Sequence, residues 1–247
     1  MTLPLFLVEP AVLAEAVAGT RLVLDGPEGR HAATVRRIAA GEGVMLADGA
    51  GLRVTCTVLG AGKAELELAV VDVAREPEAI PRFVLVQALA KGDRDDQAIE
   101  AATEFGVDEV VPWQASRSIV QWRGERGDKA RRKWESTVAA AAKQSRRARV
   151  PVVAELLTTK TLAGRVGGAA AAYLLHEDAT QSLAAQALPT EGEVLVIVGP
   201  EGGVTPEEVA ALEAAGALTV RLGDTVLRSS SAGPAALAVL SAAARWR

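Results

Sequence analysis

Beyond residue 82 the sequence alternates short apolar runs with helical segments, and this alternation limits the possible folds more than any other feature. The runs FVLVQAL, AAYLLHE, EVLVIVG and LTVRLG lack the polar alternation of a half-exposed strand. A strand that is apolar at successive positions is buried on both faces, and parallel strands need long crossover connections between them. The sequence therefore predicts an α/β domain whose mostly parallel sheet is covered by helices on both faces.

One of these apolar runs continues into a glycine-rich turn and a helix start, in the stretch VLVIVGPEGGVTPEE, residues 194–208. Thr205 is the expected N-cap, Pro206 the first helical residue, and Glu208 the partner of Thr205 in a capping box. A glycine-rich turn before a helix often binds phosphate. Here no P-loop lysine follows, the glycines do not form G-x-G-x-x-G, and Glu201 would repel an anion. We therefore expect a pocket that does not hold a nucleotide phosphate.

Three loops follow apolar runs in the last third of the chain: LLHEDA, VGPEGG and RLGDTVLRSSSAG. In open α/β sheets, ligands bind outside the carboxyl ends of the strands, where such loops leave for the helices. The three loops are therefore the predicted ligand site, although a tight turn alone would also explain a glycine pair.

Residues 1–73 have a different pattern, typical of a small β-rich unit. Alternate apolar residues in residues 52–58 predict a half-buried strand, and Asp48-Gly49 is a hairpin signal. This alternation places Cys56 in the core and does not favour a reactive thiol. Residues 27–43 are interpreted as containing a short helix that ends at Gly41. Residues 74–82 form the predicted linker, because they hold two prolines and no periodicity, and residues 83–247 form the second domain.

Composition excludes several classes of protein. One cysteine and two histidines cannot form a disulfide framework or a zinc-ligand cluster, so we expect no metal. The first residues lack a basic segment before an apolar one, and no long uncharged run follows. We therefore expect a cytoplasmic protein that is neither secreted nor embedded in a membrane.

Charge is unevenly distributed along the chain. Residues 117–149 contain 11 Lys/Arg and 3 Asp/Glu, a local charge of +8, whereas the net charge of the whole chain is -4. Such a concentration of basic residues is what an RNA or DNA ligand requires. A solvated basic helix is an equally good interpretation of the charge alone.

Several blocks together resemble a known family. They are GRHAATVRRIAAGEGVMLADGAG, LVQALAKGDRDDQAIEAATEFGVDEVVPWQASRS, AAAAKQSRRARVP, VIVGPEGGVTPEE and RLGDTVLRSSSAG. In order and spacing they resemble the 16S ribosomal RNA (uracil-N3)-methyltransferases of the SPOUT superfamily, over essentially the whole chain. The resemblance implies a C-terminal SPOUT domain with a deep trefoil knot, an N-terminal PUA-like β-barrel that binds RNA, and a homodimer.

The resemblance also implies S-adenosylmethionine as cofactor, bound among the three loops. The expected cofactor contacts are Leu175, His176, Val198, Gly199, Pro200, Glu201, Gly202, Leu222, Gly223, Val226, Leu227 and Ser230. Ser230 stands where many family members have glutamate, so this position is not expected to supply a general base here. A serine there can bond the cofactor or cap the final helix.

The substrate implied by the resemblance is a uridine of 16S ribosomal RNA in the small ribosomal subunit. Arg94 and Arg228 are the expected catalytic residues, because arginine can stabilise charge that develops on the uracil oxygens. The expected RNA contacts are Arg30, His31, Arg36, Arg37, Lys91, Arg94 and Arg147.

Three alternatives remain at this point. The first is a non-catalytic RNA-binding or ribosome-assembly protein, which would not need a glycine-lined pocket. The second is a nucleotide-dependent enzyme of Rossmann type, which would need the lysine or acidic ribose ligand that is missing here. The third is a SPOUT methyltransferase that acts on transfer RNA or on another ribosomal position.

Overall fold

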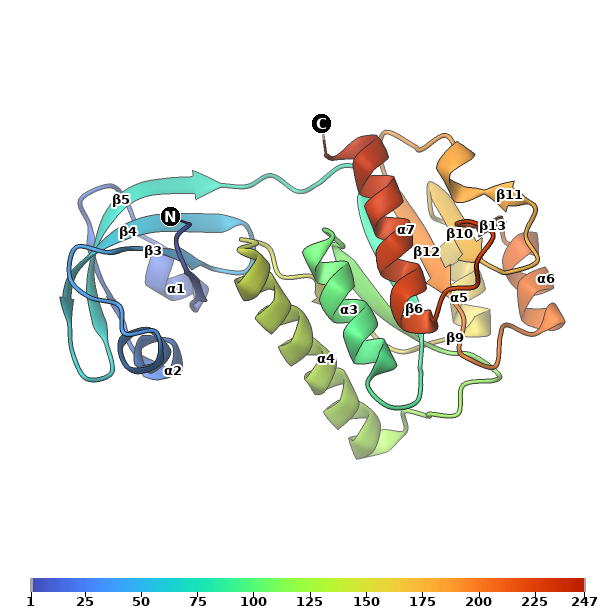
Figure 1. The fold of residues 1–247 in the computed structure, drawn as a ribbon, viewed down its shortest axis with the longest axis horizontal. Coiled ribbons are helices and arrows are strands. Elements are labelled where there is room, and N and C mark those ends of the chain that lie inside the picture. The colour runs from blue at the N-terminus through green and yellow to red at the C-terminus, as the bar shows by residue number, and fades with distance from the viewer. Residues whose placement is uncertain (1, 247) are drawn as a thin grey trace. The chain divides into compact units, whose positions relative to one another are not determined.

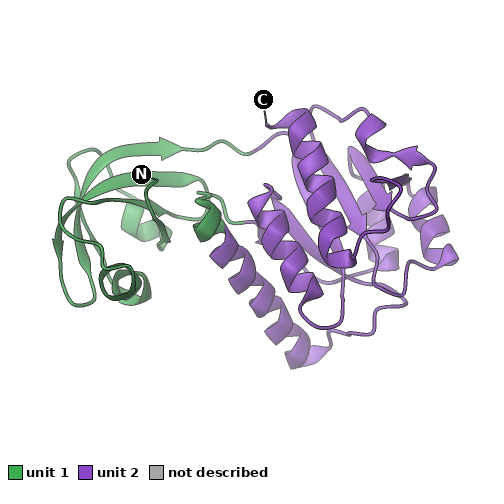
Figure 2. Ribbon diagram, viewed as in Figure 1, with its two compact units in different colours: residues 1–78, 142–150 green, residues 79–141, 151–247 purple. Residues whose placement is uncertain are grey.

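The computed structural model describes residues 2–246, which fold as two compact units (Figure 2). The first unit comprises the residues up to Glu78 together with Ala142–Val150, and the second comprises Ala79–Ala141 and the residues from Pro151 onward. The first unit thus consists of two separate stretches of chain.

The first unit is built on a five-stranded sheet with the order β1-β3-β4-β5-β2. β1 pairs with β3 in parallel, and the other pairings are antiparallel. Its elements are β1 (Leu5–Leu7), α1 (Pro10–Leu13), β2 (Arg21–Leu24), α2 (Gly26–Arg30), the π-helical turn η1 (His31–Val35), β3 (Gly43–Ala47), β4 (Leu52–Ala61) and β5 (Leu66–Arg75).

The hairpin between β3 and β4 forms where the sequence predicts it. Asp48 Oδ1 accepts hydrogen bonds from the backbone N–H groups of Ala50 at 2.7 Å and Leu52 at 3.0 Å, and so holds the turn. Val54, Cys56 and Val58 on β4 are buried in the core, as their alternation predicts. The position predicted for Cys56 is confirmed.

The predicted helix in residues 27–43 is shorter than expected. Helical structure ends at Val35, well before Gly41. Arg37 adopts a positive φ of 55°, which stops the helix. Ile38 then turns into the core, where 7% of its surface stays exposed. Burial of this apolar side chain is the physical reason for the early end.

Ala142–Val150 joins the first unit through backbone bonds to the β3–β4 turn. The N–H of Val150 donates to the carbonyl of Gly49 at 2.9 Å, and the N–H of Gly51 donates to the carbonyl of Ala148 at 3.1 Å. Ala148 is buried against Leu5 and Ala47. Nothing in the local pattern of these residues indicated that they pack with the N-terminal strands.

The second unit is a parallel α/β domain, as the apolar runs predict. Its sheet has the order β11-β13-β10-β12-β6-β7-β8, β9 also pairs with β7, and every pairing is parallel. The elements are β6 (Arg82–Ala88), α3 (Arg94–Glu104), β7 (Glu109–Gln114), α4 (Gly124–Ser145), β8 (Val152–Val153), β9 (Leu157–Thr158), α5 (Thr159–Val166), β10 (Ala171–Leu175), β11 (Gln181–Ser182), η2 (Leu183–Ala185), β12 (Glu193–Val198), α6 (Pro206–Ala214), β13 (Leu218–Arg221) and α7 (Ser229–Ala244).

Helices cover both faces of this sheet, which explains why β6 and β12 are apolar at successive positions. Val84 and Val86 of β6 belong to the core cluster that contains Leu162 of α5. Leu85 points the other way, toward Gly233 of α7, where an added Cβ would lie 2.7 Å from Leu85 Cδ1. α3 and α7 pack on one another, as do α5 and α6 (Figure 1).

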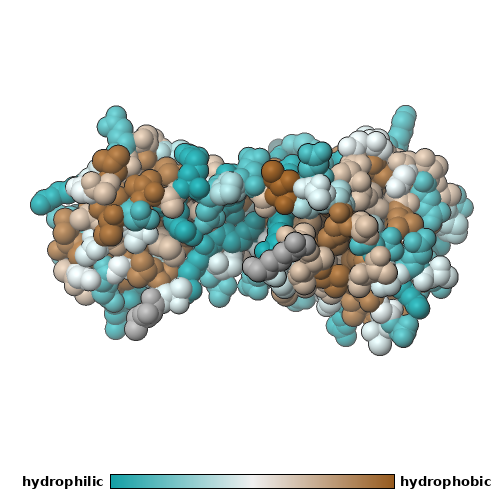
Figure 3. Space-filling view, turned by 90° about the horizontal axis from the view of Figure 1, so that it is seen from above, coloured by the Kyte–Doolittle hydropathy of each residue, from teal (hydrophilic) through white to brown (hydrophobic). Residues whose placement is uncertain are grey.

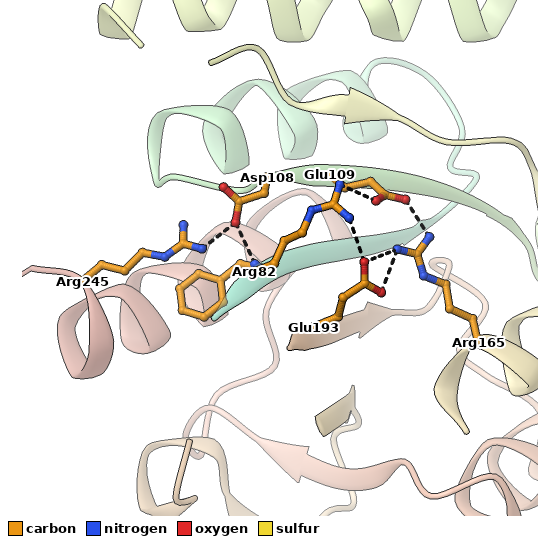
Figure 4. Close-up of polar contacts among 7 residues, drawn as sticks. Arg82, Asp108, Glu109, Arg165, Glu193 and Arg245 are labelled. Carbon is orange, nitrogen blue, oxygen red and sulfur yellow. Dashed lines mark hydrogen bonds and ion pairs between the residues drawn. The ribbon is translucent and has the colours of Figure 1, made fainter. Parts of the chain in front are cut away.

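Four charged residues close a ring at the amino-terminal edge of the sheet (Figure 4). Arg82 pairs with Glu109 at 2.8 Å and with Glu193 at 2.8 Å. Arg165, near the end of α5, pairs with the same two carboxylates at 2.6 and 3.1 Å. Arg82, Glu109 and Glu193 are the first residues of β6, β7 and β12. This four-residue charge ring therefore lies at the edge opposite the loops that leave the strands' carboxyl ends.

On the face seen in Figure 3, apolar and polar residues are interspersed in both units. Within residues 2–246, no helix is both long and apolar enough to cross a bilayer.

Candidate functional site

A cavity of about 1020 Å³ opens at the carboxyl ends of β10, β12 and β13 in the second unit. The three loops that the sequence singles out all line it. Among the expected cofactor contacts, those that line the cavity are Leu175, His176, Val198, Gly199, Pro200, Glu201, Gly202, Leu222, Gly223, Val226 and Leu227. Arg94 and Arg228 line the same cavity. The fold thus brings together residues that are up to 134 positions apart in the sequence.

Ser230 does not line the cavity, whereas Ser229 and Ala232 do. These two residues are three positions apart on α7 and so share a face, while Ser230 is rotated by roughly 100° from Ser229. Ser230 was the expected cofactor contact, but its neighbour Ser229 is the serine that lines the cavity. The rotation of residues around the axis of α7 decides which serine faces the cavity, and the sequence block alone did not indicate this rotation.

The glycine corner, residues 199–203, has the local structure that its sequence predicts. Thr205 Oγ1 accepts from the N–H of Glu208 at 3.3 Å, and Glu208 Oε2 accepts from the N–H of Thr205 at 3.1 Å, which confirms the capping box. Gly203 has a φ of 75°. At Gly199 an added Cβ would lie only 2.5 Å from Val204 Cγ2. Both glycines are thus required by the turn itself.

Glu208 has a second role that the capping-box pattern does not reveal. Its Oε1 accepts from the N–H and Oγ of Ser116, at 2.8 and 3.0 Å, and from Thr159 Oγ1 at 2.8 Å. Burial raises the pKa of the Glu208 carboxyl, but these donors outweigh it and hold the pKa below its usual value. The ionised carboxylate therefore joins α6 to the loop after β7 and to the start of α5.

Arg94 forms an ion pair with Glu201 inside the cavity. Arg94 Nη1 lies 2.8 Å from Glu201 Oε1, and the two side chains are 46% and 27% exposed. Burial raises the pKa of the Glu201 carboxyl, but hydrogen bonds from Arg94 and from the backbone N–H groups of Glu201 and Lys91 lower it overall. Glu201 is therefore ionised and joins the glycine corner to the loop that precedes α3. Lys91 itself is exposed on that loop and does not line the cavity.

Arg117 also lines the cavity, although its sequence context did not single it out as a site residue. Its Nη1 donates to the carbonyl of Gly202 at 2.9 Å. Arg117 follows β7, whereas Gly202 follows β12, so only the packing of the strands brings the two together. One signal in the sequence could have identified Arg117, namely that it stands in a block that resembles the known family.

Charges of both signs line the rest of the cavity. Arg221 pairs with Asp224 at 3.2 Å, and the Nδ1 atom of His176 accepts from the N–H of Asp178 at 3.2 Å. The Arg228 guanidinium is exposed and has no hydrogen bond or ion pair with any residue between 2 and 246. Arg228 is thus the cavity arginine whose whole guanidinium is available for an external anion, whereas Nη1 of Arg94 is bonded to Glu201.

No group of three or more His, Cys, Asp or Glu side chains in the described part of the chain could hold a metal ion. Five acidic residues line the cavity, and two of them are paired with an arginine. The paired residues are Glu201 and Asp224, and the others are Glu177, Asp178 and Glu213. The charged groups of this site therefore suit an organic ligand that carries both signs of charge.

The remaining expected RNA contacts lie in the first unit. Arg30, His31, Arg36 and Arg37 are exposed, on and just after the helical segment that ends at Val35. The His31 ring packs edge-on against Phe6, with 6.1 Å between the ring centroids.

Arg147 is half-buried in Ala142–Val150. The fold therefore gathers these five residues in one compact unit, although Arg147 is more than 100 positions from the others in sequence.

Two family models match this chain. A model described as an RNA methyltransferase domain matches residues 76–241, and a model described as an RNA methyltransferase PUA domain matches residues 24–71. The first match contains the cavity, and the second contains β3, β4 and the first part of β5 in the first unit.

Individual relatives are similar over nearly the whole chain. A protein of Mycobacterium tuberculosis named ribosomal RNA small subunit methyltransferase E is 46% identical over 233 residues, covering 92% of this chain and 89% of its own. A protein of the same name from Bacillus subtilis is 27% identical and covers 88% of each chain. The crystal structure of a third, from Neisseria gonorrhoeae with S-adenosyl methionine bound, is 25% identical, has a TM-score of 0.85 and covers 98% of each chain.

Proposed function

This chain belongs to the RNA methyltransferase family, and we propose that it methylates N3 of a specific uracil in 16S ribosomal RNA, with S-adenosylmethionine as the methyl donor. The observation that carries this proposal is the cavity at the carboxyl ends of β10, β12 and β13, which lies within the matched methyltransferase domain. A protein that only binds RNA has no need of such a cavity.

The residues that line the cavity fit this cofactor. A volume of about 1020 Å³ is enough for a nucleoside joined to an amino acid. Leu175, Val198 and Leu227 offer apolar contacts to an adenine ring, and Gly199 and Gly202 let the backbone approach closely. The ionised carboxylate of Glu201 suits a ligand that carries positive charge. When bound, the cofactor supplies a methyl group attached to a positively charged sulfur.

Arg228 and Arg94 are the proposed catalytic residues. Methylation replaces the N3 proton of uracil by a methyl group. As that proton passes to water, the electron pair of the N3–H bond stays on the ring and spreads negative charge onto the neighbouring carbonyl oxygens. The unpaired guanidinium of Arg228 can donate hydrogen bonds to these oxygens and stabilise them. Arg94, at the start of α3, can hold the target nucleotide or its phosphate. N3 lies in the Watson–Crick edge, so the target uridine must be unpaired or flipped out.

The first unit is proposed to hold the RNA. Residues 1–73 would supply phosphate contacts from Arg30, His31, Arg36 and Arg37, and Arg147 from Ala142–Val150 belongs to the same unit. Lys91 would contact RNA beside the catalytic cavity. Phosphate contacts fix the register of the RNA, and recognition of its folded shape would supply the specificity.

Assembly and location complete the proposal. Residues 83–247 would form the SPOUT domain with a deep trefoil knot, joined to residues 1–73 by the linker 74–82. The active form would be a cytoplasmic homodimer that acts on the small ribosomal subunit. Membership of the family supports these points, and light scattering that found a monomer at working concentration would contradict the homodimer.

The experiment that tests the reaction is nucleoside mass spectrometry. Small ribosomal subunits that lack the modification are incubated with the protein and S-adenosylmethionine, and 3-methyluridine is the expected product. A different methylated nucleoside would support a methyltransferase activity but show that the target is another nucleotide. If the protein neither bound S-adenosylmethionine nor formed a methylated product, the alternative of a non-catalytic RNA-binding protein would be favoured.

A companion variant tests the catalytic role of Arg228. Arg228→Ala should lower the methylation rate on the order of 10²-fold, since that is the usual effect of losing one donor to a developing oxyanion. The far-UV circular dichroism should stay unchanged, because the side chain is exposed. Wild-type turnover by this variant would remove Arg228 from the mechanism.

A further inference from the structure

The loop after β7 contacts the glycine corner through Arg117, a side chain to which the proposed reaction gives no role. Arg117 Nη1 donates to the carbonyl of Gly202 at 2.9 Å. The same side chain packs on the turn, because a Cβ added to Gly202 would lie 3.1 Å from Arg117 Cβ. A Cβ added to Gly203 would lie 3.6 Å from Arg117 Nη1. Arg117 thus bonds one residue of the turn and packs against two.

The backbone beside Arg117 is fixed by the buried carboxylate of Glu208. Glu208 is 4% exposed, and its Oε1 accepts from both the N–H and the Oγ of Ser116. The same oxygen accepts from Thr159, whose Oγ1 also accepts from Trp113 Nε1 at 3.3 Å. Three donors on one carboxylate oxygen restrict the motion of residue 116. The backbone of the next residue, Arg117, is therefore held in a fixed position.

These two sets of contacts form a closed path. It runs from the glycine corner through Thr205 into α6, from Glu208 of α6 to Ser116, and from Arg117 back to the corner. A loop that is tied at both ends by hydrogen bonds loses little conformational entropy when a ligand binds. Arg117 bonds a backbone carbonyl 85 residues away. An arginine that served only as a solvated charge of the basic segment would have no such bond.

We propose that Arg117 is a positioning residue, which acts through the carbonyl of Gly202 to hold the glycine corner in the shape that accepts S-adenosylmethionine, and that Glu208 fastens Arg117 in place. This inference rests on the proposed function, because it takes the ligand of the cavity to be that cofactor. Arg117 need not touch the reacting atoms. Its loss should therefore weaken cofactor binding and leave the chemical step at saturating cofactor unchanged.

The test is isothermal titration of the full-length protein with S-adenosylmethionine. Arg117→Ala should raise the Kd about tenfold, the usual effect of losing a hydrogen bond from a charged donor. Arg117→Lys keeps a charged donor and should recover most of the affinity. The matched control is Arg123→Ala, an exposed arginine of the same loop that does not line the cavity, and its Kd should equal that of wild type. The melting temperature of Arg117→Ala should match that of wild type.

Steady-state methylation separates positioning from catalysis. Arg117→Ala should raise the KM for S-adenosylmethionine by about the same factor as the Kd, with kcat within about twofold of wild type. A fall in kcat at saturating cofactor, with KM unchanged, would overturn the positioning role.

The role of Glu208 is tested by a double-mutant cycle on the same titration. The effects of Glu208→Gln and Arg117→Ala on the binding free energy of S-adenosylmethionine should not add in the double variant, because both act through the same path to Gly202. Additive effects on Kd would overturn the fastening role of Glu208. Wild-type affinity in Arg117→Ala would overturn the inference and leave the proposed function intact. A wild-type protein that did not bind S-adenosylmethionine would overturn both.

Discussion

The four-residue charge ring gives a stability prediction that is independent of the cavity. Glu109 is the most buried member, with 8% of its side chain exposed, and it accepts from Arg82 and from Arg165. Glu109→Gln keeps one oxygen as an acceptor but turns an NH2 group toward the other arginine. One charge-assisted hydrogen bond is therefore replaced by two facing donors, and Glu193 alone must balance both arginines.

The expected loss of unfolding free energy is about 2–3 kcal/mol. A hydrogen bond to a charged group contributes roughly 1.5–3 kcal/mol. The cost of roughly 3–5 kcal/mol for breaking a fully buried ion pair is an upper bound. Arg82 is 37% and Arg165 is 23% exposed, so water partly solvates the arginine that loses its partner.

Urea unfolding followed by tryptophan fluorescence measures this loss. All four tryptophans lie in the second unit, as the ring does, so the signal reports the right unit. The control is Glu193→Gln, whose side chain is 31% exposed and whose loss should be only about 1 kcal/mol. An effect of Glu109→Gln no larger than that of the control would refute the reasoning. S-adenosylmethionine affinity should not change in either variant, because the ring lies at the opposite edge of the sheet.

Three further predictions concern single residues. Burial raises the pKa of Asp95 to about 6, so the stability contributed by its protonated form is lost as pH rises from about 4 to 6. Asp95→Asn should thus exceed wild type in stability by about 2–3 kcal/mol at pH 7.5, with the gain vanishing near pH 4 in urea titrations; a gain independent of pH would contradict this. Gly199→Ala should lower S-adenosylmethionine affinity by tenfold or more, since its Cβ would lie 2.5 Å from Val204. The control Gly164→Ala meets nothing within 4 Å and should bind normally in the same titration. Burial raises the pKa of Cys56 to about 11, so iodoacetamide should label it at pH 7.5 only after unfolding, as mass spectrometry can check.

Features that depend on neighbouring residues could be predicted from the sequence. Apolar runs without polar alternation predicted a parallel sheet covered on both faces, and that sheet is observed. Thr205, Pro206 and Glu208 predicted the start of α6 and its capping box. Because parallel strands bring their carboxyl ends to one edge, the order of strands and loops was also enough to place three loops around one cavity.

Features that depend on helix phase or on long-range packing could not be predicted. Ser229 lines the cavity instead of Ser230 because of a rotation along α7 that no motif specifies. The early end of the helix at Val35 follows from the burial of Ile38. Both depend on which side of a helix meets the core, and tertiary packing decides this.

The sequence by itself thus determined which elements form, their order, and the edge of the sheet where the site lies. Local periodicity and capping chemistry carry that information over a few residues. Only the tertiary structure decided that Arg117 bonds Gly202, that Glu208 joins three segments, and that Ala142–Val150 packs with the first unit. Such contacts join residues far apart in the chain, and they exist only once the sheet has fixed the spacing of its strands.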